Sequence, residues 1–245
     1  MFRFVFIVFL LVLYLVVMIP FMLVLLIIRR FNNELSSKIG QKIVALVFKG
    51  MLFIAGTEVE LRGEKNIPEG GVLFISNHRS YFDILLAYAY TPKRLGFIAK
   101  AEMRRYILLK QWMDIVNCLF LDRDDLKQGL KIVLAAIEKV KSGVSVWVCP
   151  EGTRISGEDE TAMAEFKEGT FKIAEKAKAP VVPVALSKTR NIFERQFPIV
   201  KKTKVIVEYL PPIYIEELDK ETRKRVGEYS RSKIREKLLE INQEK

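Results

Sequence analysis

The first constraint on this chain is an uncharged run of 25 residues near its N-terminus. Residues 4–28 contain no Asp, Glu, Lys or Arg, and only Tyr14 and Pro20 interrupt an otherwise aliphatic and aromatic composition. As one helix the run reaches about 37 Å at ~1.5 Å per residue, and about 20 apolar residues are enough to cross a bilayer core. The run is therefore long enough to span a membrane. Partial insertion is the alternative, because Pro20 removes a backbone donor and favours a kink.

Charges on either side of the run predict its orientation. Arg29 and Arg30 end the run, Lys38 and Lys42 follow, and only Arg3 precedes it. This excess of basic residues puts the long C-terminal part on the cytoplasmic side of the cell membrane. A cleaved signal peptide is the competing interpretation, but the apolar region of a signal peptide is usually only ~7–15 residues and ends at small residues.

A second apolar pattern begins at Asn33. Its apolar residues mostly recur at steps of three or four and form one stripe of a helix: Leu35, Ile39, Ile43, Leu46, Val47, Met51 and Ile54. We expect this helix to lie in the membrane interface or to pack back on the first, with an ordinary amphipathic helix of the globular part as the alternative. In either case residues 1–56 are predicted to form a membrane-associated N-terminal helical module.

From residue 57 onward, short apolar runs alternate with helical patterns. Strands are predicted at residues 59–61, 72–76, 95–99, 115–121, 144–148, 181–186 and 204–209. Helices are predicted at residues 83–90, 101–112, 126–140, 166–177 and 216–243. The helix at 126–140 has Asp124 as its expected N-cap, Gly143 as its stop, and an apolar stripe formed by Leu126, Leu130, Val133, Leu134, Ile137 and Val140. The alternation predicts an α/β domain over residues 57–245, with a mixed, partly parallel sheet flanked by helices.

The net charge of +11 indicates an anionic partner, which is nucleic acid, a membrane surface or a phosphorylated substrate. The sequence contains no recognised nucleic-acid-binding motif, and a hydrophobic anchor argues against nucleic acid. Residues 188–204 interleave basic side chains with Phe193 and Phe197. This composition predicts a membrane-facing loop, with a solvated basic loop as the alternative.

The inventory of reactive side chains is small. His78 is the single histidine, so a histidine-cluster metal site is excluded and any imidazole chemistry must use this residue. The two cysteines, Cys118 and Cys149, lie inside apolar runs, and we expect both to be reduced and buried.

Polar residues follow the predicted strand at 72–76. The carboxyl end of a strand is where open α/β sheets build their sites. His78 and Asp83 converge there if the chain turns between them and Asp83 enters the next helix. A carboxylate that accepts from one imidazole nitrogen fixes the tautomer and leaves the other nitrogen free to deprotonate an alcohol. The alternative is a histidine that merely caps a helix.

A second polar cluster follows the predicted strand at 144–148. Gly152 allows the backbone to approach a ligand closely. Arg154 offers a planar fork suited to a phosphate, and Thr153 can add a donor. Arg123 and Lys100 follow two other predicted strands and are further candidates for contacts with a phosphate. For each of these groups the alternative is a solvated surface turn.

Four short motifs occur in order along the chain. They are Asn-His-x-x-x-x-Asp at 77–83, Phe-Leu-Asp-Arg at 120–123, Pro-Glu-Gly-Thr-Arg at 150–154 and Val-Pro-Val-Ala-Leu at 182–186. Together they resemble the four sequence blocks of the glycerolipid acyltransferases, and in particular those of the 1-acyl-sn-glycerol-3-phosphate acyltransferases. The resemblance covers about residues 57–210, and the first and third motifs are specific in combination.

The resemblance implies a mechanism and partners. His78, oriented by Asp83, would deprotonate the sn-2 hydroxyl of lysophosphatidic acid, whose oxygen would attack an acyl thioester of acyl-carrier protein or coenzyme A and give phosphatidic acid. Anionic membrane lipids are further expected partners, and no metal or organic cofactor is required. The glycerophosphate-binding residues implied by the resemblance are Arg123, Glu151, Gly152, Thr153 and Arg154, with Glu151 on the glycerol hydroxyl or holding a cation in place.

Three alternatives remain beside this hypothesis. An enzyme of the same fold can acylate glycerol 3-phosphate, and another can acylate a different lysophospholipid. A non-catalytic membrane protein that binds anionic lipid belongs to a different class, and it predicts that His78 is dispensable. A serine hydrolase is disfavoured because the Gly-x-Ser-x-Gly motif is absent.

Overall fold

The computed structural model describes residues 2–122 and 125–244, and its centre is a seven-stranded sheet. The strand order is β1-β7-β6-β2-β5-β3-β4, and every neighbouring pair is parallel except β6 and β7. The predicted mixed, partly parallel sheet is confirmed. The strands are β1 (Thr57–Arg62), β2 (Leu73–Ser76), β3 (Leu95–Lys100), β4 (Leu119–Leu121), β5 (Ser145–Val148), β6 (Val181–Ser187) and β7 (Thr203–Tyr209).

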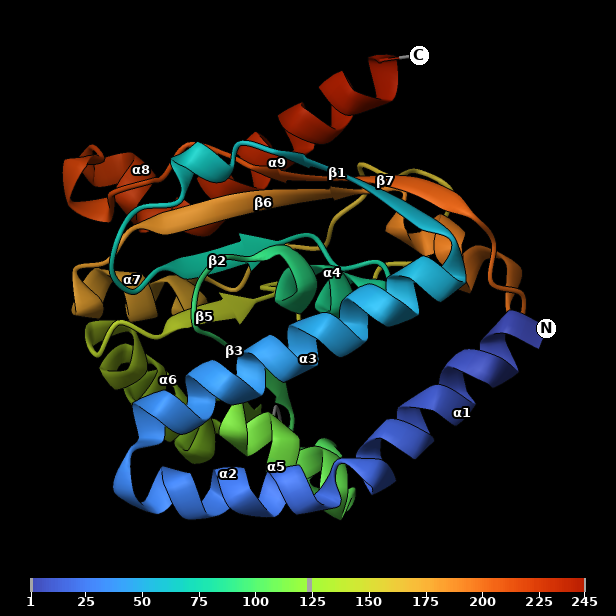
Figure 1. The fold of residues 1–245 in the computed structure, drawn as a ribbon. Helices are drawn as coiled ribbons and strands as arrows, with labels where there is room; N and C mark the ends of the chain where they lie inside the picture. The colour runs from blue at the N-terminus through green and yellow to red at the C-terminus, as the bar shows by residue number, and fades with distance from the viewer. Residues whose placement is uncertain (1, 123–124, 245) are drawn as a thin grey trace.

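The central strands are buried on both faces, which explains why they are short continuous apolar runs. Successive side chains of β2 alternate between two cores. Phe74 packs in the core on one face, whereas Leu73 and Ile75 pack in the core on the other. One face is covered by α3 (Asn33–Ala55), α4 (Phe82–Tyr90) and α5 (Ile107–Ile115), and the other by α6 (Leu126–Lys141), α7 (Lys172–Ala177) and α9 (Val226–Gln243), as Figure 1 shows.

The strand order brings the sequence motifs to one edge. The run β6-β2-β5-β3-β4 is parallel throughout, so the carboxyl ends of these five strands point the same way. Because β2 lies directly between β6 and β5, the segments that follow these three strands are neighbours.

The N-terminal apolar run forms two helices rather than one. α1 (Phe2–Val17) and α2 (Ile19–Phe31) meet at Met18, and Pro20 lies in the first turn of α2, where its missing N–H costs no hydrogen bond. Among the described residues no single helix is both long enough and apolar enough to cross a bilayer. By length and composition, α1 and α2 together meet those criteria as a pair bent by 54°.

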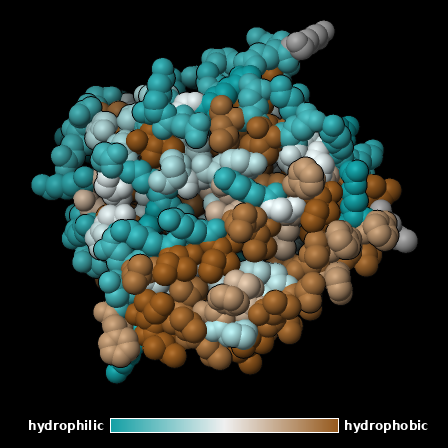
Figure 2. Space-filling model, in the orientation of Figure 1, coloured by the Kyte–Doolittle hydropathy of each residue, from teal (hydrophilic) through white to brown (hydrophobic). Residues whose placement is uncertain are grey.

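The outer surface of α1 and α2 is apolar. Figure 2 shows hydrophobic side chains gathered over the lower part of the molecule, where Figure 1 places these two helices. A continuous exposed patch of this kind marks a surface that contacts a membrane or a partner. We call this patch the apolar face. Its residues are Phe2, Val5, Phe6, Val8, Phe9, Val12, Leu13, Val16, Val17, Phe21, Leu23, Val24, Ile27 and Phe31.

Helix α3 packs against α2 and α5 through a face that apolar periodicity did not predict. Leu35 and Leu46 of the predicted stripe are exposed, while Ser36 and Gly40 are buried. The reason is close packing: the Ser36 hydroxyl donates to the carbonyl of Leu25 at 2.8 Å, and a Cβ on Gly40 would meet the Ile115 side chain at 2.3 Å. Small residues are buried here because the neighbouring elements leave no room for larger ones.

Several predicted element boundaries were wrong. The predicted strand at 115–121 shortens to β4, because Ile115 is the last residue of α5. The predicted helix at 101–112 divides into a 3₁₀ turn (Ala101–Arg105) and α5. The predicted helix at 166–177 begins as a 3₁₀ turn (Glu168–Phe171) before α7.

The predicted helix at 216–243 is also interrupted. It divides into a 3₁₀ turn (Ile215–Glu217), α8 (Lys220–Lys224) and α9. Asp219 starts α8 as a new N-cap by accepting from the amides of Glu221 and Thr222.

The structure of α6 differs from the prediction in its N-cap and in which residues of its apolar stripe are buried. Asp125 is the N-cap, since its side chain accepts from the Gln128 amide, and the expected cap Asp124 lies outside the described residues. Ile137 and Val140 are buried, but Leu126 is 90% exposed. Leu130 and Leu134 are exposed as well. The leucines share one helix edge, and that edge turns away from the sheet.

The loop at 188–204 is divided between core and surface. Phe193 is buried and stacks on Phe4 of α1 with ring centroids 4.8 Å apart, whereas Phe197 is exposed. Of the two aromatic residues predicted to face the membrane, Phe193 therefore packs inside the protein.

One side chain links α3 to the start of β3. The Gln41 oxygen accepts from the amide of Leu95 at 2.7 Å, and its NH₂ group donates to the carbonyl of Lys93. Gln41→Leu leaves the buried Leu95 amide unpaired, and we expect the free energy of unfolding to fall by about 1–3 kcal/mol in chemical denaturation. The control Gln243→Leu, on an exposed residue of α9, should change it little. A Gln41→Leu variant as stable as wild type would contradict this docking role.

Candidate active site

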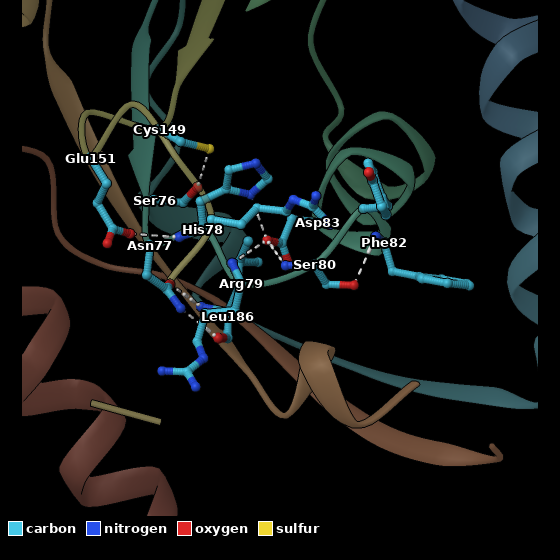
Figure 3. Close-up of polar contacts among 12 residues, drawn as sticks. Ser76, Asn77, His78, Arg79, Ser80, Phe82, Asp83, Cys149, Glu151 and Leu186 are labelled. Atoms are coloured by element: carbon cyan, nitrogen blue, oxygen red, sulfur yellow. Dashed lines mark hydrogen bonds and ion pairs between the residues drawn. The ribbon is translucent and has the colours of Figure 1, made fainter. Parts of the chain in front are cut away.

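The segment between β2 and α4 is anchored to the sheet by Asn77. Its amide NH₂ group donates to the carbonyl of Leu186 at 2.9 Å, and its oxygen accepts from the Leu186 amide at 2.9 Å. This pair of hydrogen bonds imitates a strand pairing between the end of β2 and β6 (Figure 3). The residue that follows, His78, is thereby held at the carboxyl edge of the sheet.

His78 and Asp83 meet as the sequence predicted. The Nδ1 atom of His78 lies 2.8 Å from Oδ2 of Asp83, which occupies the first turn of α4. The same oxygen accepts from the amides of Arg79 at 2.8 Å and Ser80 at 2.9 Å. Because a carboxylate only accepts hydrogen bonds, the neutral imidazole carries its proton on Nδ1, and Nε2 is left as the basic nitrogen.

The two side chains differ in exposure. Asp83 is 2% exposed, whereas the side chain of His78 is 18% exposed and can be reached from outside. Backbone amides and the N-terminus of α4 compensate the buried carboxylate charge. The buried Asp83 carboxylate therefore holds the imidazole at Nδ1, and part of the ring remains accessible.

Electrostatics favour the protonated imidazole. Burial alone would lower the pKa of His78. The sulfur of Cys149 and the carboxylate of Asp83 act in the opposite direction and hold that pKa above its ordinary value. Cys149 is half-buried and lies beside the imidazole (Figure 3), so only Cys118 is buried as predicted; both thiols are free.

Glu151, which follows the neighbouring strand β5, binds the backbone of the segment that contains His78. Its two oxygens accept from the amides of His78 at 2.7 Å and Ala164 at 2.9 Å (Figure 3). Burial raises the pKa of this carboxyl to about 7, against the opposing effect of the two amides. The sequence interpretation placed Glu151 on a glycerol hydroxyl or a cation, whereas the structure places its carboxylate on backbone amides.

The motif at 150–154 lies directly beside His78. The amide of Ile155 donates to the carbonyl of His78 at 2.9 Å. Gly152 has a φ of +75°, a conformation that suits glycine, and Thr153 is exposed. The guanidinium of Arg154 lies over the ring of Tyr81, 3.6 Å from its centroid. A cation is thus held within the same loop cluster as the imidazole.

Two further residues predicted to contact a phosphate are Lys100 and Arg123. Lys100 ends β3, and its ammonium pairs with Glu102 at 2.8 Å near the surface. Arg123 lies outside the described residues. The Lys100 ammonium is therefore engaged by a neighbouring carboxylate in this structure.

Two other residues of the cluster, Arg79 and Glu194, were not predicted from the sequence. The buried guanidinium of Arg79 donates to the carbonyls of Gly157 at 2.5 Å and Ala162 at 3.4 Å, which secures the loop after the third motif. Glu194 accepts from the Ser80 hydroxyl and the Tyr81 amide, each at 2.7 Å. Glu194 lies more than 110 positions from its partners, so spacing carries no information about the contact.

Comparison with known proteins identifies relatives. The acyltransferase family model matches residues 58–187. A 1-acyl-sn-glycerol-3-phosphate acyltransferase from Saccharomyces cerevisiae is 30% identical over 195 residues, which cover 79% of this chain and 63% of that protein. The protein of the same name from Salmonella typhimurium is 26% identical over 191 residues, which cover 77% and 76% of the two chains. The chain thus spans less than two thirds of the yeast relative.

A solved structure has the same fold. The crystal structure of the 1-acyl-sn-glycerophosphate (LPA) acyltransferase from Thermotoga maritima superposes with a TM-score of 0.78 at 23% identity. The match covers 99% of this chain and 97% of that chain, so it includes the N-terminal helices as well as the sheet.

The buried Glu151 carboxyl predicts a pH-dependent stability. Folding raises the pKa of this carboxyl from 4.5 to about 7, so the folded protein holds the proton more tightly than the unfolded chain does. The free energy of unfolding therefore falls as the pH rises from 4.5 to about 7. Glu151→Gln removes the ionisation but keeps one accepting oxygen. The free energy of unfolding of the variant relative to wild type should therefore rise by on the order of 2 kcal/mol from pH 5 to pH 8 in denaturation experiments. A difference that stays constant over this range would contradict the account.

Proposed function

The chain belongs to the acyltransferase family, and we propose that it transfers an acyl chain from a thioester to the sn-2 hydroxyl of a 1-acylglycerol 3-phosphate. The observation that carries this proposal is the His78–Asp83 pair at the end of β2, with a buried carboxylate and an accessible imidazole, beside the guanidinium of Arg154. The names of the yeast, Salmonella and Thermotoga relatives support this acceptor.

His78 acts as the general base. Its Nε2 atom removes the proton of the sn-2 hydroxyl while that oxygen attacks the thioester carbonyl. The tetrahedral intermediate then collapses, the C–S bond breaks, and the departing sulfur takes the proton back from the imidazolium. The products are phosphatidic acid and the free thiol of acyl-carrier protein or coenzyme A. General-base catalysis of this kind contributes about 10²–10⁴-fold.

Asp83 supports this base in two ways. Its carboxylate accepts from Nδ1 and so keeps Nε2 free, and its charge stabilises the imidazolium that forms in the transition state. The amides of Arg79 and Ser80 hold the carboxylate in the orientation that this role requires. Catalysis therefore depends on a proton that stays on Nδ1 throughout.

Arg154 is the proposed contact for the acceptor's phosphate. A guanidinium presents paired donors that match phosphate oxygens, and stacking on Tyr81 fixes its plane before the ligand arrives. The exposed residue Thr153 and the half-buried Gly152, with its φ of +75°, lie on the same loop. Lys100 and Arg123 remain proposed substrate contacts from the carboxyl ends of β3 and β4.

The membrane supplies the acceptor. We propose that residues 1–56 form a membrane-associated module, with the apolar face in the lipid, and that residues 57–245 form the catalytic domain on the cytoplasmic side. The pair Arg29 and Arg30 at the end of α2 is placed to contact anionic headgroups.

The first test is the pH dependence of acyl transfer. Because the pKa of His78 is raised, the basic form grows as the pH increases, so kcat/KM should rise with pH and level off only above the ordinary histidine value of 6.5. Asp83→Asn should lower kcat by about 10²-fold or more and move the inflection to lower pH, since one cause of the raised pKa is removed. His78→Ala should abolish transfer with folding retained.

Two outcomes would contradict the general-base mechanism. One is an activity that stays flat from pH 8 to well below pH 5, and the other is wild-type turnover in Asp83→Asn. Retention of vesicle binding and cellular function by His78→Ala would instead favour a non-catalytic lipid-binding protein.

The second test is an acceptor and donor panel. Purified protein is incubated with 1-acylglycerol 3-phosphate, glycerol 3-phosphate or a lysophosphatidylcholine, each with an acyl-carrier-protein or coenzyme A thioester. We expect the highest kcat/KM for 1-acylglycerol 3-phosphate, and Arg154→Ala should raise its KM about tenfold or more. A preference for glycerol 3-phosphate would overturn the proposed acceptor, and an unchanged KM in Arg154→Ala would overturn the role of this arginine.

A further inference from the structure

The start of α4 has no capping side chain of its own. Tyr81 is the N-cap residue, and its side chain accepts none of the free amides of the first turn. The first amides of a helix have no partner within the helix and need acceptors from elsewhere. Here Asp83 accepts from the amides of Arg79 and Ser80, and the Ser80 oxygen accepts from the amide of Phe82 at 3.0 Å (Figure 3).

Glu194 supplies the missing acceptor from a distant part of the chain. It begins a 3₁₀ turn (Glu194–Gln196) beyond β6, and its side chain is only 16% exposed. One oxygen accepts from the amide of Tyr81 at 2.7 Å, and the other accepts from the hydroxyl of Ser80 at 2.7 Å. A carboxylate at this position is favourable because it faces the positive end of the helix.

The same carboxylate reaches the phosphate-binding arginine. The oxygen that accepts from the Tyr81 amide lies 3.4 Å from Nη1 of Arg154, and this guanidinium rests on the Tyr81 ring. Glu194 therefore contacts Arg154 directly and also determines the position of the ring beneath it.

We propose that Glu194 is a positioning residue of the acceptor site, which holds Tyr81 and the start of α4 so that the Arg154 guanidinium is presented to the acceptor's phosphate. This inference rests on the proposed function, because it assigns Glu194 to the recognition of the phosphorylated acceptor.

The placement of Glu194 depends on the apolar N-terminal helix. Its neighbour Phe193 stacks on Phe4 of α1, and the Phe197 ring lies 5.3 Å from Phe193 and 6.0 Å from Phe4. The rings anchor the 3₁₀ turn between α1 and the sheet. Residues 193 and 194 thus link the position of α1, which carries part of the apolar face, to the orientation of Arg154.

The kinetic experiment compares Glu194→Ala, Glu194→Gln and a matched control, Glu158→Gln. Glu158 is an exposed carboxylate paired with Arg190 and Arg195, so its variant removes the same charge without touching the α4 start. Glu194→Ala should raise KM for 1-acylglycerol 3-phosphate about tenfold or more, with a smaller effect on kcat. Glu194→Gln keeps an oxygen for the Tyr81 amide and should restore KM to within about threefold of wild type, and the control should match wild type.

A second measurement needs no substrate. Amide hydrogen exchange of residues 79–82 in the ligand-free protein should be about tenfold faster in Glu194→Ala, near wild type in Glu194→Gln and unchanged in Glu158→Gln. If Glu194→Ala folds poorly, Glu194→Gln still tests the inference, because exchange much faster than wild type in a variant that keeps an oxygen for the Tyr81 amide would contradict it.

The outcomes separate this inference from the proposed function. A wild-type protein that does not acylate 1-acylglycerol 3-phosphate defeats the proposed function, and with it the role of Glu194 toward the phosphate. An active wild type with an unchanged KM in Glu194→Ala defeats the inference alone. So does a lower KM in both Glu194 variants, which would make Glu194 a competitor of the phosphate for Arg154.

Discussion

The structure of the site depends on one buried oxygen atom. Oδ2 of Asp83 accepts simultaneously from the ring of His78 and from the amides of Arg79 and Ser80. Burial of an unpaired carboxylate would cost several kcal/mol, so these donors are a condition of its being there. The same oxygen therefore has two roles: it holds the backbone of the loop, and it selects the tautomer of His78.

Three carboxylates from three segments hold the same loop. Glu151 accepts from the amide of His78, Asp83 from the next two amides, and Glu194 from the amide of Tyr81. The parallel arrangement of β6, β2 and β5 makes this possible, since the segments after these strands emerge side by side. The loop is therefore rigid although it lacks regular structure, and general-base catalysis requires such fixed geometry.

Sequence reasoning succeeded where the information is local or repeated. Apolar runs marked the buried strands, and the five-residue spacing of His78 and Asp83 was enough to predict their meeting across a turn. It failed where burial depends on a distant neighbour. Leu126 and Leu35 are apolar yet exposed, because periodicity reports which residues are apolar and not which face is covered. The amide partners of Glu151 and Glu194 could not be predicted for the same reason: the sequence does not show which backbone amides a carboxylate will bind in the folded chain.

The most direct test of the central claim uses the fact that His78 is the only histidine in the chain. Protein labelled with ¹⁵N-histidine gives imidazole signals from this residue alone, and these signals report which ring nitrogen carries the proton. We expect the neutral ring to be protonated on Nδ1, with Nε2 unprotonated, because Asp83 accepts from Nδ1. A neutral ring protonated on Nε2 would leave Nδ1, the nitrogen that faces Asp83, as the basic one, and would contradict the mechanism.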